Sequence, residues 1–369
     1  MPTPVAHQWI DTPEKLRHVL PGSSSPQILA LDTEFMRRNT FYPQLALLQV
    51  GLADTTALID PLAFQPQRPL LNLLENPANC CVMHSASEDM EALAELLPHG
   101  PGRLFDTQVA AALCGLGAGL SYQRLVLEIT GETLQKGETR SDWLQRPLTR
   151  SQCEYAALDV VHLHAIHEQL HALLARLGRV QWLDEEGQRI CRRAERDRID
   201  PQPQRGLGAA ADWPREQQAL LRRILLWREA TARELDQPRP WLFNDKQALD
   251  LAAHPPVDLG QLREQMRGQR AMRAPQCKAL LEELRRPVSD QEAEATADIP
   301  PPLDGRQRNL VKRLQQAVAT LAAELDVPPG LLCPRKRLEE LLATGSWPTT
   351  LEGWRKPLLE PVLAPLLPD

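Results

Sequence analysis

The chain has 369 residues, of which 43% are hydrophobic and 4% aromatic, so it is long enough for two or three domains with real cores. It has no apolar run long enough to span a bilayer, and its N-terminus lacks a basic segment followed by an apolar one. The sequence therefore predicts neither a membrane protein nor a secreted one. Its seven cysteines are scattered and form no C-x-x-C pair, which is typical of reduced thiols in the cytoplasm.

The net charge of -6 is unevenly distributed, and the distribution is more informative than the total. Residues 1–205 carry 19 basic and 25 acidic side chains, and residues 291–304 carry 4 acidic and no basic ones. Residues 206–290 and 305–369 each have a net charge of +2. The two C-terminal segments are thus mildly basic, which permits a nucleic-acid partner without establishing one.

Strand patterns come first along the chain. The segments "QILALDTEF" and "QLALLQVGLA", which begin at Gln27 and Gln44, are predicted strands, and "ADTTALIDP" suggests a third. "CCVMHS", from Cys80, is a further short apolar run.

Helix patterns follow. We expect helices at 87–97 with Ser87 as N-cap, at 105–115 ending at Gly115, and at 151–178 as one long helix ending at Gly178. Strands mixed with helices in this way favour an α/β sandwich.

The C-terminal part of the chain contains two segments with similar sequences. A shift of 90 residues superimposes "ELD" at 234–236 on "ELD" at 324–326, and apolar helical positions coincide around both. After one presumed deletion, Leu249 would align with Leu338. A duplicated small helical domain explains this pattern better than chance similarity of two amphipathic helices.

Segments 201–211 and 287–304, rich in proline and polar residues, are predicted as flexible linkers. The predicted domains are an α/β domain, a first helical domain, an acidic linker and a second helical domain, at 1–205, 206–290, 291–304 and 305–369. The helical domains are expected to lie outside the core of the α/β domain.

Two carboxylates stand in the first strand. In a strand, residues i and i+2 project to the same side, so Asp32 and Glu34 share a face. Carboxylates are rarely buried without a partner or a metal ion. For this motif alone, the simpler interpretation is that the two carboxylates lie on a surface strand or form an ion pair with Arg37 or Arg38.

Further acidic residues strengthen the interpretation of Asp32 and Glu34 as part of a metal-binding site. Asp89 falls in the first turn of a predicted helix, where the helix dipole alone would favour it. Tyr155 and Asp159 lie four residues apart on a predicted helix and therefore share a face, and Asp159 stands within an apolar run.

This order of residues resembles ribonuclease D, in the DEDD exonuclease superfamily, which is defined by D-x-E, a second Asp, and Y-x-x-x-D or H-x-x-x-x-D. Glu154 occupies the place of the histidine, so the chain resembles the tyrosine subclass. The segments "LDTEF", "FYPQLALLQV", "FDTQVAAAL" and "SDWLQRPLTRSQCEYAALDV" are also similar to ribonuclease D. Both C-terminal copies resemble the HRDC domain, the second more distantly, with Ala317 where the first has Trp227.

The resemblance implies an RNase H-like (DnaQ-like) mixed-sheet domain followed by two all-α HRDC-like domains. It implies a metal-dependent 3′–5′ exoribonuclease that trims the 3′ ends of tRNA precursors and other stable RNAs and releases nucleoside 5′-monophosphates. Two Mg²⁺ or Mn²⁺ ions about 4 Å apart would be held by the carboxylates of Asp32, Glu34, Asp89 and Asp159. Tyr155 would orient the attacking water, because an ordinary phenol is a poor base at neutral pH.

Two other functions stay open at this point: a DNA-directed proofreading-type exonuclease, and a non-catalytic RNA-binding scaffold. Basic and polar residues that could contact RNA are His84, Lys136, Arg140, Arg222, Arg223, Lys312, Arg313, Arg335, Lys336 and Arg337. Trp143 is interpreted as a packing residue, with base stacking as the alternative. A zinc site at His162, His164 and His167 is disfavoured, because no further ligand joins them.

Overall fold

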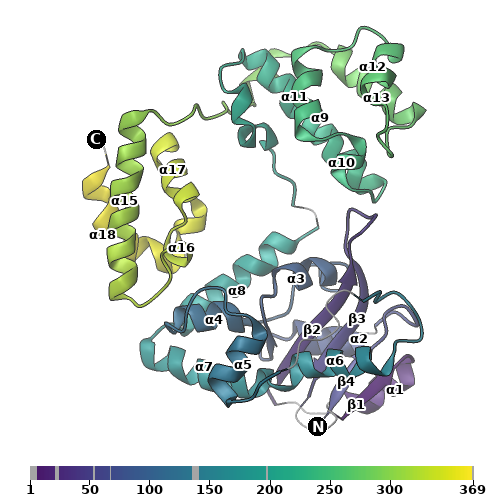
Figure 1. The fold of residues 1–369 in the computed structure, drawn as a ribbon, viewed down its shortest axis with the longest axis vertical. Coiled ribbons are helices and arrows are strands. Elements are labelled where there is room, and N and C mark those ends of the chain that lie inside the picture. Colours follow the sequence, from purple (N-terminus) through teal and green to yellow (C-terminus); the bar gives the residue numbers. More distant parts are fainter. Residues whose placement is uncertain are drawn as a thin grey trace. The chain divides into compact units, whose positions relative to one another are not determined.

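The computed structural model describes residues 6–20, 25–52, 55–66, 68–134, 141–196 and 198–367. The chain forms two compact units (Figure 1). The first unit contains the described residues of 6–36, 44–196 and 306–367, and the second contains 37–43 and 198–305. Each unit has its own core.

A six-stranded mixed sheet is the centre of the first unit. The strands are β1 (His7–Ile10), β2 (Ile28–Met36), β3 (Gln44–Gly51), β4 (Thr56–Ile59), β5 (Cys80–Met83) and β6 (Leu104–Asp106), in the order β1-β4-β3-β2-β5-β6. β2 is antiparallel to β3 and parallel to β5, so it lies in the middle of the sheet. The predicted mixed-sheet α/β fold is confirmed, and β1 and β6 are short strands that the sequence pattern did not reveal.

Helices cover both faces of the sheet. Their bounds are α1 (Pro13–Val19), α2 (Arg68–Glu75), α3 (Ser87–Leu93), α4 (Thr107–Leu113), α5 (Tyr122–Thr130), α6 (Arg150–Val161), α7 (Leu163–Leu177) and α8 (Val180–Ala194). One face of β2 packs Leu29 and Leu31 into a core with α1, α2, α3 and α8. The other face lies under α5, α6 and α7, so polar side chains that β2 places there are enclosed between sheet and helices.

Several details of the predicted helices are wrong. The helix expected at 105–115 begins only at Thr107, because Phe105 and Asp106 belong to β6. The long helix expected at 151–178 is divided at His162 into α6 and α7, which lets α6 pack across β2, β3 and β4 while α7 packs on β2 and β5. Ser87 is not an N-cap, because it is already the first residue of α3 and Ala86 precedes it without a side-chain cap. The predicted end of α7 at Gly178 is confirmed by the left-handed backbone of that glycine, at φ 68°.

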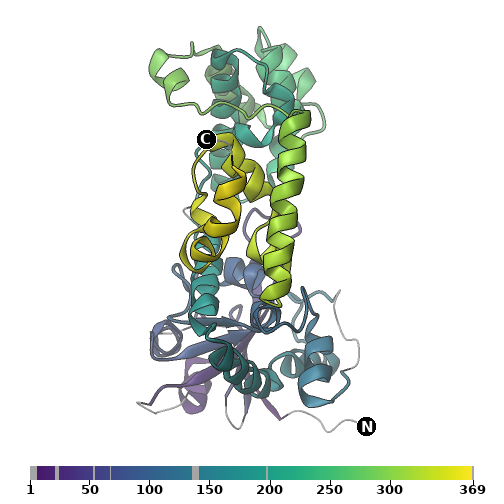
Figure 2. The ribbon, with the colours of Figure 1, turned by 90° about the vertical axis from the view of Figure 1, so that its left-hand side faces the viewer.

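Residues from 306 onward belong to the same unit as the sheet, contrary to the expectation that the second helical segment lies outside the catalytic core. This segment contains α15 (Gly305–Glu324), α16 (Pro329–Leu332), α17 (Arg335–Thr344) and α18 (Lys356–Leu363), seen side by side in Figure 2. Its apolar residues share one core with α4, α5 and α7. Removing it would therefore expose apolar surface of the exonuclease domain.

Charged and aromatic contacts join this segment to α8. Arg355 is buried and forms a bidentate ion pair with Glu186, in which the Nη2 to Oε2 distance is 3.0 Å. The Trp354 indole donates to Glu186 over 2.8 Å and stacks on Trp182 at a centroid distance of 4.5 Å. The interface is therefore ordered by a buried charge pair within an aromatic contact.

Arg355→Met is expected to destabilise the protein by about 2 kcal/mol, because it removes the bidentate partner of the buried Glu186 carboxylate, whose remaining ion pair is with Arg189. It also leaves the Leu331 carbonyl without its donor. Chemical denaturation of the full chain measures this. Addition of Glu186→Gln should recover part of the loss, because the buried charge that has lost its bidentate partner is then removed. A double variant as unstable as Arg355→Met alone would contradict the assignment.

The second unit is helical. It contains α9 (Arg215–Glu234), α10 (Arg239–Leu242), α11 (Asp245–Ala253), α12 (Leu259–Gln265), α13 (Ala274–Arg285) and α14 (Asp290–Glu294). Its core includes Leu221, Ile224 and Phe243, with Trp227 stacked on Phe243 at 6.1 Å. Residues 37–43, which connect β2 to β3, belong to this unit, and Asp236 accepts hydrogen bonds from the backbone of Phe41 and Tyr42 at 3.0 Å.

The segments predicted as flexible linkers are built into this second unit. Gln204 is fully buried and donates to the carbonyl of Ala297 over 2.8 Å. Glu292 forms an ion pair with Arg223 on α9, and Ile299 is buried in the core. Polar composition thus gave the wrong prediction, because polar side chains of these segments bond a backbone carbonyl and an arginine elsewhere in the unit.

Helix bounds repeat along the chain at an offset of 90 residues. α9 and α15 both have 20 residues, and α10 and α16 both have four. α11 begins at Asp245 and α17 at Arg335, so no deletion separates them, and Leu338 corresponds to Ala248, not to Leu249. Asp236 and Asp326 both have left-handed backbones, at φ 48° and 51°, which few side chains adopt.

Candidate active site

β2 presents two carboxylates at the centre of the sheet. Its side chains alternate, so Leu29, Leu31 and Thr33 face one core while Asp32 and Glu34 face the other side. The register with β3 shifts directly after Glu34, between Glu34 and Phe35. Such irregularities bend a strand and re-aim its side chains next to active sites.

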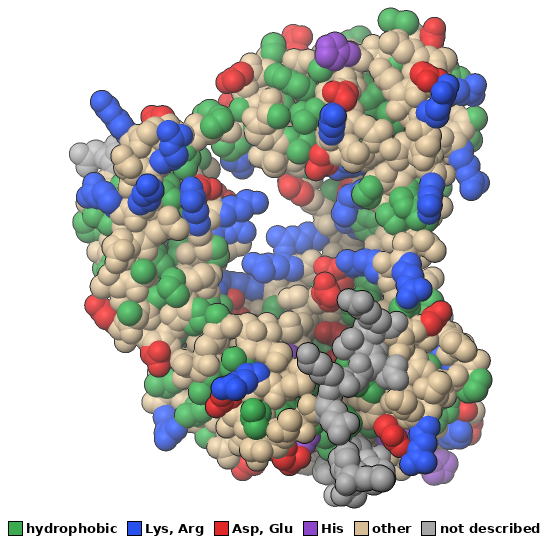
Figure 3. Space-filling view, viewed as in Figure 1, with side chains coloured by type: hydrophobic (Ala, Val, Ile, Leu, Met, Phe, Trp, Pro, Cys, Tyr) green, Lys and Arg blue, Asp and Glu red, His purple; other side chains and the backbone are tan. Residues whose placement is uncertain are grey.

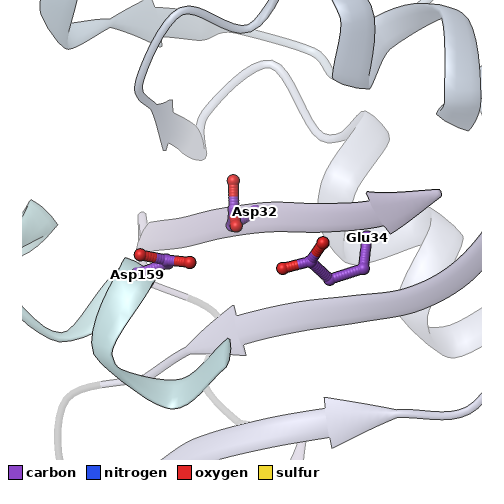
Figure 4. Close-up of side chains that lie close together, drawn as sticks. All are labelled: Asp32, Glu34 and Asp159. Carbon is purple, nitrogen blue, oxygen red and sulfur yellow. The ribbon is translucent and has the colours of Figure 1, made fainter. Parts of the chain in front are cut away.

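Helix α6 brings the third carboxylate to β2. It begins at a capping box in which Thr149 and Gln152 bond each other's backbone groups, so its start is fixed. Asp159 follows 10 residues after Thr149, and one ligand oxygen each from Asp32, Glu34 and Asp159 lie within 4.8 Å of one another. Figure 4 shows the three side chains converging from the strand and the helix.

Asp89 joins the site from α3. It is buried, and it accepts a 2.5 Å hydrogen bond from the hydroxyl of Thr33, the residue between the two strand carboxylates. Its charge acts on both Asp32 and Glu34, because it helps to raise their pKa values. Thr33 thus fixes the position of Asp89 from the opposite face of β2.

Asp106 is a positioning residue that the sequence analysis missed. Its buried carboxylate accepts from the backbone of Ser85 and Ala86, at 3.3 and 2.8 Å, immediately before the helix of Asp89. It also caps α4 through Gln108 and Val109. The "FDTQ" motif could have predicted that Asp106 caps a helix, since an Asp before a helical run is a typical N-cap.

Burial and mutual repulsion hold protons on these carboxylates when no cation is bound. Burial, with repulsion from neighbouring acids, raises the pKa of Glu34 to about 9 and that of Asp159 to about 7. Burial raises the pKa of Asp89 to about 6, and it raises the pKa of Asp32 well above its ordinary value. Carboxylates arranged in this way have a strong affinity for a divalent cation, which cancels their repulsion.

Tyr155 lies one helical turn before Asp159, as predicted. Its hydroxyl hydrogen-bonds to the Asp159 carboxylate, and burial together with this bond and the neighbouring acids raises its pKa. The phenol therefore stays protonated at neutral pH and acts as a donor. Trp143 is buried, and its ring centroid lies 6.2 Å from that of Tyr155, so it supports the Tyr155 ring by packing.

The metal-free protein should lose stability as pH rises from about 4 towards 9. The folded state keeps protons that the unfolded chain releases near the ordinary carboxyl pKa of about 4, and it gives them up only near the raised pKa values of about 6, 7 and 9. Stability is thus full below the ordinary pKa and declines through this window. We expect the Tm in EDTA to fall by at least about 3 °C between pH 6 and pH 9.

Calorimetry of the wild type and of Glu34→Gln measures this effect. The variant removes the group with the pKa of about 9, so its Tm should depend less on pH. The Tm gain on adding Mg²⁺ should grow with pH in the wild type, because the ion competes with protons. Identical slopes in both proteins would show that the carboxylates titrate normally.

Asp32, Glu34 and Asp159 form the one cluster of three or more potential metal ligands within the described ranges. The histidines after Asp159 form no such cluster there: His164 bonds the Ile28 carbonyl at 3.1 Å, and His167 packs on Phe105 at 4.6 Å. Oxygen ligands of this kind suit hard divalent ions such as Mg²⁺ or Mn²⁺. The residues present therefore fit a divalent metal site.

Several candidates for RNA contact have other roles. Both ring nitrogens of His84 are within hydrogen-bond distance of protein atoms, Thr107 Oγ1 at 2.9 Å and the Leu120 carbonyl at 3.1 Å. Arg223 is buried and bonds Glu292 and three backbone carbonyls, so it is structural. Arg222 bonds the Pro201 carbonyl at 2.7 Å.

The remaining candidates are on the surface or outside the described residues. Arg335 and Arg337 form ion pairs with Glu339 and Glu340 within α17. The side chains of Lys312, Arg313 and Lys336 are exposed on α15 and α17, and Figure 3 shows Lys and Arg gathered on that part of the surface. Lys136 and Arg140 lie outside the described residues.

No helix in the described part of the chain is long and apolar enough to cross a membrane. The sequence profile of the 3′-5′ exonuclease family matches residues 7–175, and that of the HRDC domain matches 217–284. Fold, acidic cluster and these matches define a metal-dependent nuclease of the 3′–5′ exonuclease class with an HRDC domain.

Curated relatives identify the family. Ribonuclease D of Xanthomonas oryzae pv. oryzae is 41% identical over 97% of this chain and 98% of its own length. Ribonuclease D of Pseudomonas paraeruginosa is 35% identical over 95% of this chain and 94% of its own. The crystal structure of Escherichia coli RNase D, an exoribonuclease involved in structured RNA processing, matches with TM-score 0.80 and 29% identity over 98% of both chains. The chain belongs to the ribonuclease D family and is a hydrolase of the 3′–5′ exoribonuclease class.

Proposed function

We propose that this enzyme trims the 3′ ends of RNA, precursors of tRNA in particular, in the cytoplasm, and releases nucleoside 5′-monophosphates with two Mg²⁺ or Mn²⁺ ions. The observation that carries the proposal is the convergence of Asp32, Glu34 and Asp159 oxygens within 4.8 Å. The structured-RNA substrates of the Escherichia coli relative support the substrate class.

The proposed roles follow from position. Asp32, Glu34, Asp89 and Asp159 would hold the ions, which when bound would activate water and stabilise the leaving oxygen of an in-line displacement. Thr33 and Asp106 fix Asp89, the carboxylate supplied by a separate helix. Tyr155, whose one O–H is donated to Asp159 in this structure, would turn it to the attacking water when Asp159 holds an ion, and would orient that water because its raised pKa makes it a poor base.

We also propose that residues 305–369 form a second, divergent HRDC domain. The 90-residue repeat of helix bounds and the two left-handed aspartates, Asp236 and Asp326, support this. Lys312, Arg313 and Lys336 are the candidates for phosphate contact in that segment, since they are exposed.

End-labelled substrates test the function. We expect an RNA with a 3′ extension to be shortened from its 3′ end in Mg²⁺ or Mn²⁺, with mononucleotide products carrying 5′-phosphates, and to stay intact in EDTA. A DNA strand of the same sequence should be degraded more slowly. Equal or faster degradation of DNA would favour the proofreading-type alternative, and binding without cleavage in either metal would favour a scaffold.

A further inference from the structure

Gln49 is a buried polar residue that the roles above do not use. It lies in β3 with no exposed surface, and neither Nε2 nor Oε1 of its amide has a hydrogen-bond partner among the described residues. Leaving a buried polar group unpaired costs about 1–3 kcal/mol. A buried amide at this position therefore indicates a role other than packing.

The sheet register places this amide beside the carboxylates. Gln49 is directly opposite Asp32 on β2 and Leu58 on β4, and directly opposed residues project to the same face. Along β3, its neighbours on this face are Leu47 and Gly51. Asp32 is thus the one polar residue among these four neighbours in the sheet.

Helix α6 closes the space above Gln49 with small apolar residues. A Cβ at Gly51 would lie 3.5 Å from the side chain of Val160, so this face of β3 lies directly beneath the helix. The buried residues of α6 include Ala156 and Ala157, which leave room for a long side chain and offer it no polar group. Cβ atoms of directly opposed residues are about 5 Å apart, so the amide can reach the Asp32 carboxylate.

We propose that Gln49 is a positioning residue of the metal centre: its side-chain N–H, unpaired in this structure, donates to the Asp32 carboxylate when an ion is bound and turns the other oxygen of Asp32 toward Glu34 and Asp159. The inference rests on the proposed metal site. Groups that hydrogen-bond a metal-binding carboxylate fix its orientation, and their loss typically costs 10-fold to 100-fold in metal affinity.

The test compares Gln49→Met with Leu58→Met in the full chain. Methionine matches glutamine in length and lacks the amide, and Leu58 is the other cross-strand neighbour of Gln49, on the side away from Asp32. Mn²⁺ binding is measured by the EPR signal of the free ion, thermal unfolding is measured in EDTA, and the Mg²⁺ dependence of RNA cleavage is measured separately.

For Gln49→Met we expect a Tm in EDTA equal to or above that of the wild type, because an unpaired buried amide is removed. Mn²⁺ should bind about 10-fold more weakly, and half-maximal cleavage should need about 10-fold more Mg²⁺. Leu58→Met should bind the ion like the wild type. Gln49→Leu, which is smaller, serves if the methionine variant does not fold.

Wild-type Mn²⁺ affinity in a folded Gln49→Met or Gln49→Leu protein would overturn the proposal. So would an equal loss of affinity in Leu58→Met, since the effect would then come from packing under α6. Failure of the metal site itself would appear differently, as unchanged Mn²⁺ binding when Asp32 is replaced by asparagine.

Discussion

Asp32→Asn is expected to lower exonuclease activity by at least about 10³-fold while the protein stays folded. The metal ions of such sites contribute several kcal/mol to transition-state stabilisation, and each 1.4 kcal/mol is about tenfold in rate. Asp32 stands at the centre of the cluster, because its pKa is raised by burial and then by the charges of Asp89, Asp159 and Glu34. An asparagine keeps its shape and removes the charge that would bind the ion.

Stability should change in the opposite direction in the absence of metal. With one acid fewer, repulsion among the remaining carboxylates falls, so the Tm of Asp32→Asn in EDTA at pH 8 should be at or above that of the wild type. Glu154→Gln is the matched control, since Glu154 lies beside Tyr155 on α6 but pairs with Arg150 at the surface. Near wild-type hydrolysis by Asp32→Asn would refute the two-metal proposal, and a lower Tm would refute the repulsion argument.

The parts of this site that could be predicted are those that local periodicity determines. The two-residue period of a strand places Asp32 and Glu34 together, and the helical period places Tyr155 beside Asp159. These rules apply within single elements. The contact between α6 and β2 follows from tertiary packing, and here the resemblance to ribonuclease D supplied what periodicity could not.

The failures have a common physical cause, which is that side-chain partners lie far away in sequence. Gln204 is buried because its amide meets Ala297, 93 residues later, so a polar segment forms part of a core. Arg223 looked like a phosphate contact on a charged helix, yet it is paired with Glu292, 69 residues away. Ser87 seemed a good cap, and Asp106 holds that turn instead.

The net charge of a segment predicts its RNA-binding surface only in part, again because side-chain partners lie elsewhere in the fold. Among the basic candidates in the described residues, Arg223, Arg335 and Arg337 form ion pairs and Arg222 bonds a carbonyl group. Basic side chains that are already paired, whether buried or exposed, offer less positive charge to phosphate, so a count of basic residues overestimates the RNA-binding surface. The exposed lysines on α15 and α17 are better candidates because exposure, not composition, selects them.

Tyr155→Phe is expected to lower kcat by about 10²-fold and leave metal affinity nearly unchanged. The substitution removes only the hydroxyl that bonds Asp159, while the ring keeps its packing against Trp143. Because burial and the neighbouring acids raise the pKa of Tyr155, the wild-type hydroxyl is protonated throughout the range from pH 7 to pH 9. The loss should therefore be the same at every pH in that range, as expected of a donor that orients water.

Tyr122→Phe provides the control for Tyr155→Phe. Tyr122 is also buried near the site, but its hydroxyl donates to the carbonyl of Leu158 over 3.2 Å, so its removal should cost stability and little kcat. Single-turnover cleavage of a short RNA at saturating Mg²⁺ separates the chemical step from binding and product release. A deficit for Tyr155→Phe that grows with pH would assign the phenol a role as general base, and an unchanged single-turnover rate would reduce Tyr155 to a packing residue.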